Sequence, residues 1–196
     1  MKILHIISGL EPKSGGTKTF LTQLIIKQKL NGLEPQLLSL SKKKNDFLDS
    51  IEYQEIKKTR IRTFIFDSFS TYKLSFKFLF WLIKNFSNYD CIHIHALFRF
   101  PVDVSMLLSS LWRVPTVFSP HGSFDRNLLF ISNFKIFGIL CKKLIMFVLL
   151  KSIHKVNFHF TTESEKESCL FKVKNNRSFI IPIGIDIPSK SSLNSK

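Results

Sequence analysis

Residues 2–40 read KILHIISGLEPKSGGTKTFLTQLIIKQKLNGLEPQLLSL, and this stretch decides the fold class. Residues 2–8 form a short apolar, β-branched run that is typical of a buried strand. A glycine-bearing loop follows, and apolar residues then recur near helical spacing over residues 20–30, with Gly32 where a helix C-cap would stand. Residues 36–40 predict a second strand. Strand, loop, helix and strand make a βαβ unit, which predicts a parallel sheet.

Strand-like and helix-like segments continue to alternate along the chain. Further strands are predicted at residues 61–66, 91–95, 115–119, 155–160 and 178–181, and helices at residues 72–86, 102–112, 133–153 and 164–171. The polar residues 42–58 predict a solvated loop or a broken helix. This pattern predicts one doubly wound, Rossmann-like α/β domain over residues 1–186. The Ser- and Lys-rich residues 187–196 predict a disordered tail or a truncated interdomain linker.

Composition narrows the class of protein. With 196 residues and 44% hydrophobic content, the chain can bury a real core. Three widely spaced cysteines suggest neither a disulfide framework nor a CxxC metal site, and they favour a reducing, cytoplasmic setting. We expect no secretory signal, because the apolar run at the start is too short. We also expect no membrane span, because the longest stretch without charged residues, 114–124, contains two prolines and a histidine.

The net charge of +15 bears on the kind of partner. The excess is spread evenly over both halves of the chain, so there is no basic tail, and 23 of the 29 basic residues are Lys. Reading of bases and bidentate phosphate binding favour Arg, so nucleic acid is not expected as a partner. An anionic membrane surface or an anionic small molecule is favoured. Compositional bias toward Lys and Phe is an equally simple explanation.

In a doubly wound sheet, ligands bind beyond the carboxyl ends of the strands, so the loops that follow strands hold the candidate site residues. Gly15 and Gly16 precede a predicted helix that begins near Thr17, and the free N–H groups of a helix start attract anions such as a diphosphate. Lys18 would help to hold negative charge there. The pattern is neither GxGxxG nor a P-loop, so a plain turn explains it equally well.

Histidines stand at the ends of two predicted strands. His93 and His95 share one sheet face by alternation, but no Asp, Glu or Cys completes a metal site, so we expect none. His93 is interpreted as an interior histidine, whereas His95 can reach a cleft. His121 ends the next strand and is followed by Gly122, which permits unusual backbone angles, and by Arg126. A histidine in that position is well placed to meet a polar ligand.

Glu163 opens a predicted helix directly after a strand, with Thr161 and Thr162 as candidate N-caps. An early carboxylate is favourable at the positive end of the helix dipole, which is a sufficient structural reason for it.

Together these segments resemble the N-terminal half of the GT-B glycosyltransferases of family 4, the retaining, nucleotide-sugar-dependent kind. The resemblance extends over nearly the whole chain, and the SPHG form is most similar to bacterial enzymes that build surface polysaccharides. At Ile183 the family usually has Asn. The matching segments are Gly15-Gly16 with its helix, and residues 90–95 (DCIHIH), 114–122 (VPTVFSPHG), 161–166 (TTESEK) and 181–186 (IPIGID).

The resemblance implies transfer of a hexosyl group from a nucleotide sugar to a cell-surface glycan or polyprenyl-linked acceptor. It implies a nucleotide sugar as co-substrate, with no cofactor and no obligate metal. His121 is the catalytic residue in this comparison, near the transferred sugar or the leaving group. The residues implied in binding substrate and donor diphosphate are Gly15, Gly16, Thr17, His95, Gly122, Arg126 and Glu163.

In that family a second Rossmann-like domain holds most of the nucleotide-sugar site, including two glutamates eight positions apart. No two glutamates of this chain have that spacing. We therefore expect the chain to be inactive alone and to need a C-terminal half, in the same protein or as a partner chain.

The alternative is a non-catalytic, membrane-associated or partner-binding module from a truncated or split gene. Lys-bearing apolar helices at residues 72–86 and 133–153 fit peripheral docking on the inner face of the plasma membrane, although helices that simply cover the sheet would look the same. An NAD-dependent dehydrogenase is disfavoured because GxGxxG is lacking.

Overall fold

The computed structural model describes seven parts of the chain: residues 1–9, 16–41, 51–70, 72–96, 99–123, 156–169 and 173–184. Three sequence-based expectations fall outside these ranges. They are the helix at residues 133–153, the domain boundary at residue 186 and the tail at residues 187–196. All three stay predictions.

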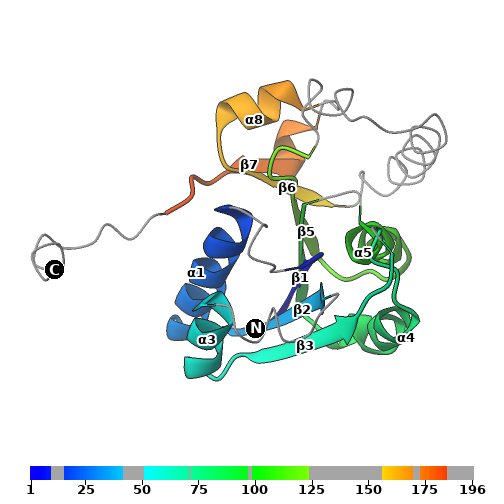
Figure 1. Ribbon diagram of the computed structural model, residues 1–196. Helices are drawn as coiled ribbons and strands as arrows, with labels where there is room; N and C mark the ends of the chain where they lie inside the picture. The colour runs from blue at the N-terminus through cyan, green and yellow to red at the C-terminus, as the bar shows by residue number, and fades with distance from the viewer. Residues whose placement is uncertain are drawn as a thin grey trace, which may run out of the picture.

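The described strands form one parallel sheet of seven strands in the order β3-β2-β1-β4-β5-β6-β7 (Figure 1). The chain starts in the middle of the sheet, moves outward to β3, returns to β4 beside β1, and then moves outward on the other side. The junction of β1 and β4 is therefore the point at which the strand order reverses, where such sheets bind ligands. The strands are β1 (Lys2–Ile7), β2 (Glu34–Ser41), β3 (Arg62–Asp67), β4 (Cys91–His95), β5 (Thr116–Ser119), β6 (Asn157–Phe160) and β7 (Ser178–Ile180).

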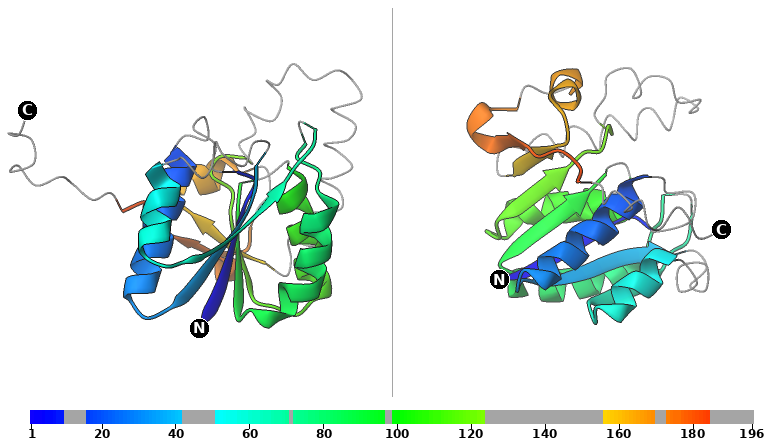
Figure 2. Two further views of the ribbon diagram at one scale, coloured as in Figure 1. Left: turned by 60° about the horizontal axis from the view of Figure 1, so that its bottom comes forward. Right: turned by 90° about the vertical axis from the view of Figure 1, so that its left-hand side faces the viewer.

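Helices cover both faces of the sheet. α1 (Gly16–Leu30) and α3 (Ile51–Lys58) lie on one face, and α4 (Phe76–Asn85) and α5 (Phe100–Leu111) lie on the other (Figure 2, left). α8 (Glu163–Ser168) follows β6, and two short 3-10 turns span Phe86–Asn88 and Asn175–Arg177. None of the helices in the described ranges is long and apolar enough to span a bilayer.

Local chemistry sets the ends of the helices. Gly32, with a φ of 80°, ends α1 at the position expected for a C-cap, since only glycine adopts this angle without strain. Ser75 begins α4, because its hydroxyl accepts a hydrogen bond from the Phe78 N–H at 3.4 Å. Thr162 caps α8 by accepting a hydrogen bond from the Glu165 N–H at 3.0 Å. The prediction of an N-cap threonine is thus confirmed.

The main apolar core lies between the sheet and α4 and α5. Alternate residues of the four adjacent strands β1, β4, β5 and β6 point into it, and seven of them are fully buried apolar residues. They are Leu4, Ile6, Ile92, Ile94, Phe118, Phe158 and Phe160. Phe78, Leu82, Val102 and Met106 of α4 and α5 pack onto them. A smaller apolar cluster joins α1 and α3 to Ile7 and Leu37 on the opposite face.

The fold class predicted from sequence is confirmed: the structure is α/β, with a parallel, Rossmann-like sheet. All seven expected strands are present, and β4 has the predicted bounds. The helix expected at residues 72–86 begins later, at Phe76, because Phe69 and Leu74 pair across a tight turn and Lys73 has a left-handed φ of 59°. Within residues 42–58, α3 takes up the last eight residues.

Candidate functional site

Two strained loops follow the neighbouring strands β4 and β5. Ala96 comes directly after β4 with a φ of 63°, and His121 comes shortly after β5 with a φ of 50°. Left-handed backbone costs a non-glycine residue on the order of 1–3 kcal/mol, and such residues gather at ligand-binding sites. The Ala96 N–H donates to the Ser119 carbonyl at 2.9 Å, so the two loops are joined. Both lie at the carboxyl edge of the sheet, next to the point where the strand order reverses.

His121 sits in a tight four-residue turn. The Ser123 N–H donates to the Pro120 carbonyl at 3.0 Å, and both central residues, His121 and Gly122, have positive φ angles of 50° and 77°. Positive φ at both central positions is the pattern of a type I′ turn. Gly122 meets this requirement without strain, whereas His121 is held in it by its contacts.

A carboxylate from α8 fixes this turn from outside. Glu165 Oε1 accepts a hydrogen bond from the Gly122 N–H at 2.9 Å, and Oε2 accepts from both the N–H and the hydroxyl of Thr161 at 2.8 Å. Glu163, the acidic residue singled out from sequence, is exposed at the first position of α8. Glu165, two residues later, is the carboxylate that joins α8 to the His121 turn.

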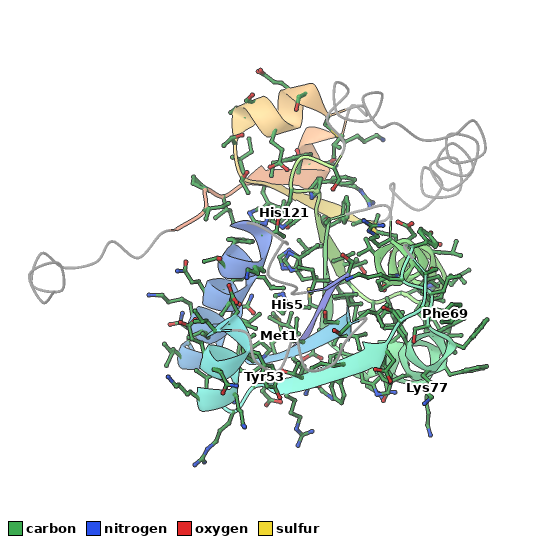
Figure 3. The ribbon with its side chains drawn as sticks, viewed as in Figure 1. Met1, His5, Tyr53, Phe69, Lys77 and His121 are labelled. Carbon is green, nitrogen blue, oxygen red and sulfur yellow. The ribbon has the colours of Figure 1, made fainter. Side chains whose placement is uncertain are left out.

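Five polar side chains fill the face of β1, β4, β5 and β6 that looks toward α1. They are His5, His93, His95, Ser119 and His159, each nine-tenths or more buried. They share one face because each alternates with an apolar residue of the opposite face, and because β1 and β4 pair in register with His5 opposite His93. Figure 3 places His5 and His121 between α1 and the strands. We call this group the histidine face.

One chain of hydrogen bonds runs from α1 through the histidine face to the strained turn. Gln28 Oε1 lies 2.8 Å from His5 Nε2, and His5 Nδ1 lies 3.2 Å from His95 Nε2. His95 Nδ1 then lies 3.2 Å from His121 Nε2. The ring of His95 stacks on that of His121, with 5.5 Å between centroids. His95 is fully buried beneath His121. It therefore influences the edge of the sheet only through its contact with His121.

A second chain links the outer strands. His93 Nε2 lies 2.8 Å from Ser119 Oγ, and Ser119 Oγ lies 2.9 Å from His159 Nδ1. His159 Nε2 lies 3.0 Å from the carbonyl oxygen of Ile181. His93 is thus a buried, hydrogen-bonded interior residue, as interpreted from its place in the strand.

The imidazoles of His5, His93, His95 and His121 are neutral at pH 7. Burial lowers the pKa of His5 to about 4. Burial also lowers the pKa of His121 to about 4, against the opposing pull of the Glu165 carboxylate. The pKa values of His93 and His95 fall well below 6.5, first through burial and then through repulsion by the neighbouring imidazoles. Each ring therefore carries one N–H donor and one bare nitrogen acceptor.

His5, His93 and His95 also have the arrangement of a potential metal site. One ring nitrogen from each lies within 4.8 Å of the others. Neutral imidazoles suit a divalent transition metal. Both nitrogens of His5 and of His95 are hydrogen-bonded, however, so an ion would have to replace the bond between these two rings. His5 is the third ligand position that sequence reasoning missed.

The start of α1 adjoins the histidine face. Phe20, one turn into the helix, packs edge-on against His121 with 5.4 Å between ring centroids. Gly16 is exposed at the first position of α1, and a Cβ added there would meet no atom within 4 Å. Thr17 follows, half-buried. Lys18, expected to hold negative charge, forms an ion pair with Glu52 of α3 at 2.8 Å.

Lys73 brings a positive charge to the same edge of the sheet. It is only 7% exposed, and its Nζ donates a hydrogen bond to the carbonyl of Ser8, directly after β1, at 2.9 Å. Nothing in the sequence around residue 73 signalled this placement. Gly15 and Arg126 lie outside the described residues, and their predicted roles stay predictions.

Comparison with known proteins decides the family. The model of Glycosyltransferase Family 4 matches residues 14–188, which is most of the chain. The chain belongs to glycosyltransferase family 4. No curated protein matches it.

Among solved structures, this family 4 chain is similar to Anabaena HepE. HepE in complex with UDP superposes with a TM-score of 0.62 at 14% identity, covering 98% of this chain and 48% of HepE. HepE with UDP and glucose gives a TM-score of 0.60 with the same identity and coverage. Acinetobacter baumannii MurG gives 0.47 at 9% identity, covering 84% of this chain and 42% of MurG. The likeness to HepE shows the fold, and this chain spans about half of HepE's length.

Proposed function

We propose that this family 4 chain forms the acceptor-side wall of a nucleotide-sugar-dependent glycosyltransferase. The observation that carries the proposal is the His121–Gly122 turn, held from three sides at the carboxyl edge of the sheet. Glu165 holds it from α8, His95 from β4, and Phe20 from α1. A strained turn fixed so completely is preorganised for a ligand.

The start of α1 fits the role of meeting a donor diphosphate. Its first N–H groups lack partners within the helix and carry the positive end of the helix dipole. Gly16 leaves open space in front of them, and the edge-on packing of Phe20 on His121 keeps this helix end beside the turn. In this proposal Gly15, Gly16 and Thr17 approach the diphosphate, and His121, Gly122 and Arg126 face the sugar and its leaving group.

The transfer itself exchanges one C–O bond for another. The bond between the anomeric carbon and the donor diphosphate breaks, and an acceptor hydroxyl forms the new bond on the same face, losing its proton. Helix N–H groups and basic side chains can offset the charge that develops on the leaving diphosphate, so the proposal needs no obligate metal. We propose a cell-surface glycan or a polyprenyl-linked sugar as acceptor.

Two walls are needed to orient two substrates. The chain spans about half of HepE, and the structures of HepE contain UDP and glucose. We therefore propose that transfer requires a second Rossmann-like domain, supplied in the same protein or by a partner chain.

The test is sugar transfer by the 196-residue chain alone and by the same chain joined to a donor-binding domain of family 4. Radiolabelled nucleotide sugars and polyprenyl-linked acceptors report turnover. We expect turnover only from the joined protein. Robust turnover by the chain alone would contradict the need for a second wall, and a folded joined protein that transfers no sugar from any donor would contradict the transferase assignment.

A specific surface favours a second function, peripheral binding to an anionic membrane. Phe76, Phe80 and Ile83 of α4 are 66%, 71% and 41% exposed, and their spacing of four and three residues places them on one stripe. The ring of Phe69 packs at a tilt against that of Phe76, with 6.0 Å between centroids, and Lys77 lies on the same outer side of the molecule as Phe69 (Figure 3). Aromatic side chains beside lysines fit the interface of an anionic bilayer.

Vesicle co-sedimentation tests this second function. Binding should rise with the fraction of anionic lipid and fall with added salt, because the Debye length shrinks. Replacing Phe76 and Phe80 with Asn should abolish most of it. Ile51→Asn, at an equally exposed site on the opposite side of the sheet, is the matched control and should bind like the parent. Equal binding to neutral and anionic vesicles would show that the basic charge reflects composition alone.

A further inference from the structure

The hydrogen-bond chain from Gln28 to His121 has a direction. A carbonyl oxygen can only accept, so Gln28 Oε1 requires the proton on His5 Nε2. A neutral imidazole has a single N–H, so His5 Nδ1 is bare and must accept from His95 Nε2. By the same rule His95 Nδ1 is bare and accepts from His121 Nε2. His121 is left with a bare Nδ1.

Each step depends on the rings being uncharged, and burial ensures this. His5 and His95 are both fully buried, and an imidazolium there would be both desolvated and next to other rings. A second, independent series of hydrogen bonds in the same cluster ends on a backbone carbonyl, which can only accept. His159 Nε2 therefore donates to the Ile181 carbonyl oxygen, and His159 Nδ1 lies 2.9 Å from the Ser119 hydroxyl oxygen.

We propose that Gln28 is a positioning residue that sets the tautomer of His121 through His5 and His95. The ring nitrogen of His121 that the chain does not use then accepts a hydrogen bond and cannot donate one. It fits a ligand hydroxyl and not an unprotonated phosphate oxygen, which has no hydrogen to give. The tautomer follows from the hydrogen-bond contacts and the burial of the rings, whereas the statement that the hydroxyl is a sugar hydroxyl rests on the proposed function.

Gln28 acts on His121 only through the two histidines between them. Gln28 lies near the end of α1, three turns beyond Gly16, and its side-chain oxygen contacts His5, the innermost of the three hydrogen-bonded histidines. A merely structural role for Gln28 would affect stability and leave the tautomer of His121 unchanged. The tautomer is therefore the quantity to measure.

Long-range 1H–15N correlation spectra of the 15N-labelled chain at pH 7 report which nitrogen of each histidine carries the proton. Signals are assigned with single histidine variants. We expect the Nε2–H form for His5, His95 and His121. Gln28→Glu keeps an oxygen acceptor and should preserve all three. Gln28→Lys offers only donors to His5 and should reverse the chain, making Nδ1–H the dominant form of His121.

Two internal controls keep the result interpretable. His93 and His159 belong to the separate series of hydrogen bonds through Ser119. Their tautomers should be unchanged in every variant and so report that the fold is intact. Gln23→Leu removes a half-buried amide of the same helix that takes no part in the hydrogen bonds from Gln28 to His121. This variant should change no tautomer. If Gln28→Lys fails to fold, Gln28→Arg carries the same donor-only character.

An Nδ1–H form of His121 in the parent chain would overturn the proposal, because the Gln28 amide would then face His5 with its nitrogen. An Nε2–H form that persists in a folded Gln28→Lys or Gln28→Arg variant would overturn it as well. Neither outcome depends on sugar transfer, so the proposed function and this inference can fail separately.

Discussion

The two faces of the same four strands differ sharply. Toward α4 and α5, β1, β4, β5 and β6 present mainly apolar side chains, such as Ile94 and Phe118, with the buried Thr116 among them. Toward α1, they present the histidine face, in which each polar group is paired with another. The apolar face needs only close packing, whereas the histidine face needs each donor matched to an acceptor. The first holds the sheet together, and the second positions His121.

The largest effect should come from a cavity in the apolar face. Phe118 is fully buried and packs edge-on against Phe158, with 5.7 Å between ring centroids. Phe118→Ala should reduce the free energy of unfolding by about 3–5 kcal/mol, measured by urea denaturation. Its neighbour Val117 is half-buried on the other face, and Val117→Ala should cost less than about 2 kcal/mol. Equal losses would show that the two faces do not differ in this way.

Acid should reduce the free energy of unfolding through the buried histidines of the histidine face and through His121. The pKa values of His5 and His121 are about 4 in the folded chain, below the unfolded value of 6.5, so the unfolded state binds more protons between these limits. The stabilisation is complete above pH 6.5 and is lost as pH falls toward 4. A difference of one pKa unit corresponds to about 1.4 kcal/mol. The pKa difference of His5 alone should therefore change the free energy of unfolding by on the order of 3 kcal/mol across this pH range.

Urea denaturation at pH values from 7.5, above the unfolded pKa, down to 4.5, close to the folded pKa, checks this prediction. His5→Gln, which keeps polar atoms without a titrating ring, should make the curve shallower. A free energy of unfolding that stays constant from pH 7 to pH 5 would mean that these histidines titrate normally.

Loss of the Glu165 carboxylate should cost less than either change. Glu165→Ala leaves the Gly122 N–H and the two Thr161 donors without their acceptor, which should reduce the free energy of unfolding by about 1–3 kcal/mol. Glu163→Ala removes an exposed carboxylate of the same short helix and should stay within about 0.5 kcal/mol of the parent. Similar losses for both would show that α8 needs acidic residues only for its dipole.

The smallest effect concerns the turn itself. Gly122 has a φ of 77°, and Gly122→Ala should reduce the free energy of unfolding by about 1 kcal/mol through backbone strain. Gly16→Ala meets open space at the start of a helix and should leave stability unchanged or slightly higher. Thermal denaturation of both variants distinguishes them, and an unstrained Gly122→Ala would remove the argument for a preorganised turn.

The fold was accessible from sequence because alternation and spacing are local signals. The alternation in CIHIH separated the apolar residues Ile92 and Ile94 from His93 and His95, and β4 has the bounds it predicts. The site was less accessible, because it depends on which strands become neighbours. His5 contacts His95 across 90 positions of sequence, and no single segment shows this.

The sequence nevertheless contained a pattern from which the histidine face could have been predicted. β1, β4 and β6 each carry a histidine between apolar residues, in KILHII, CIHIH and NFHF, and a parallel sheet places such positions on one face. The sequence pattern could not show that Glu165, and not Glu163, contacts the His121–Gly122 turn. It depends on the distance from α8 to the Gly122 turn, 43 positions earlier in the chain.

The most direct test of the account is turnover by the joined protein carrying His121→Ala. Because the free Nδ1 of His121 is assigned to a ligand, kcat/KM for sugar transfer by the folded variant should fall by roughly 10²–10³-fold, the range for losing one preorganised hydrogen-bonding group. Loss of the hydrogen bond to the buried His95 should reduce the free energy of unfolding by about 1–3 kcal/mol, so the variant still folds. Phe118→Leu, a matched change on the apolar face, should lower the melting temperature and leave kcat/KM of the folded protein nearly unchanged. Normal turnover with Ala at position 121 would contradict the account, since the histidine face would then hold only a turn.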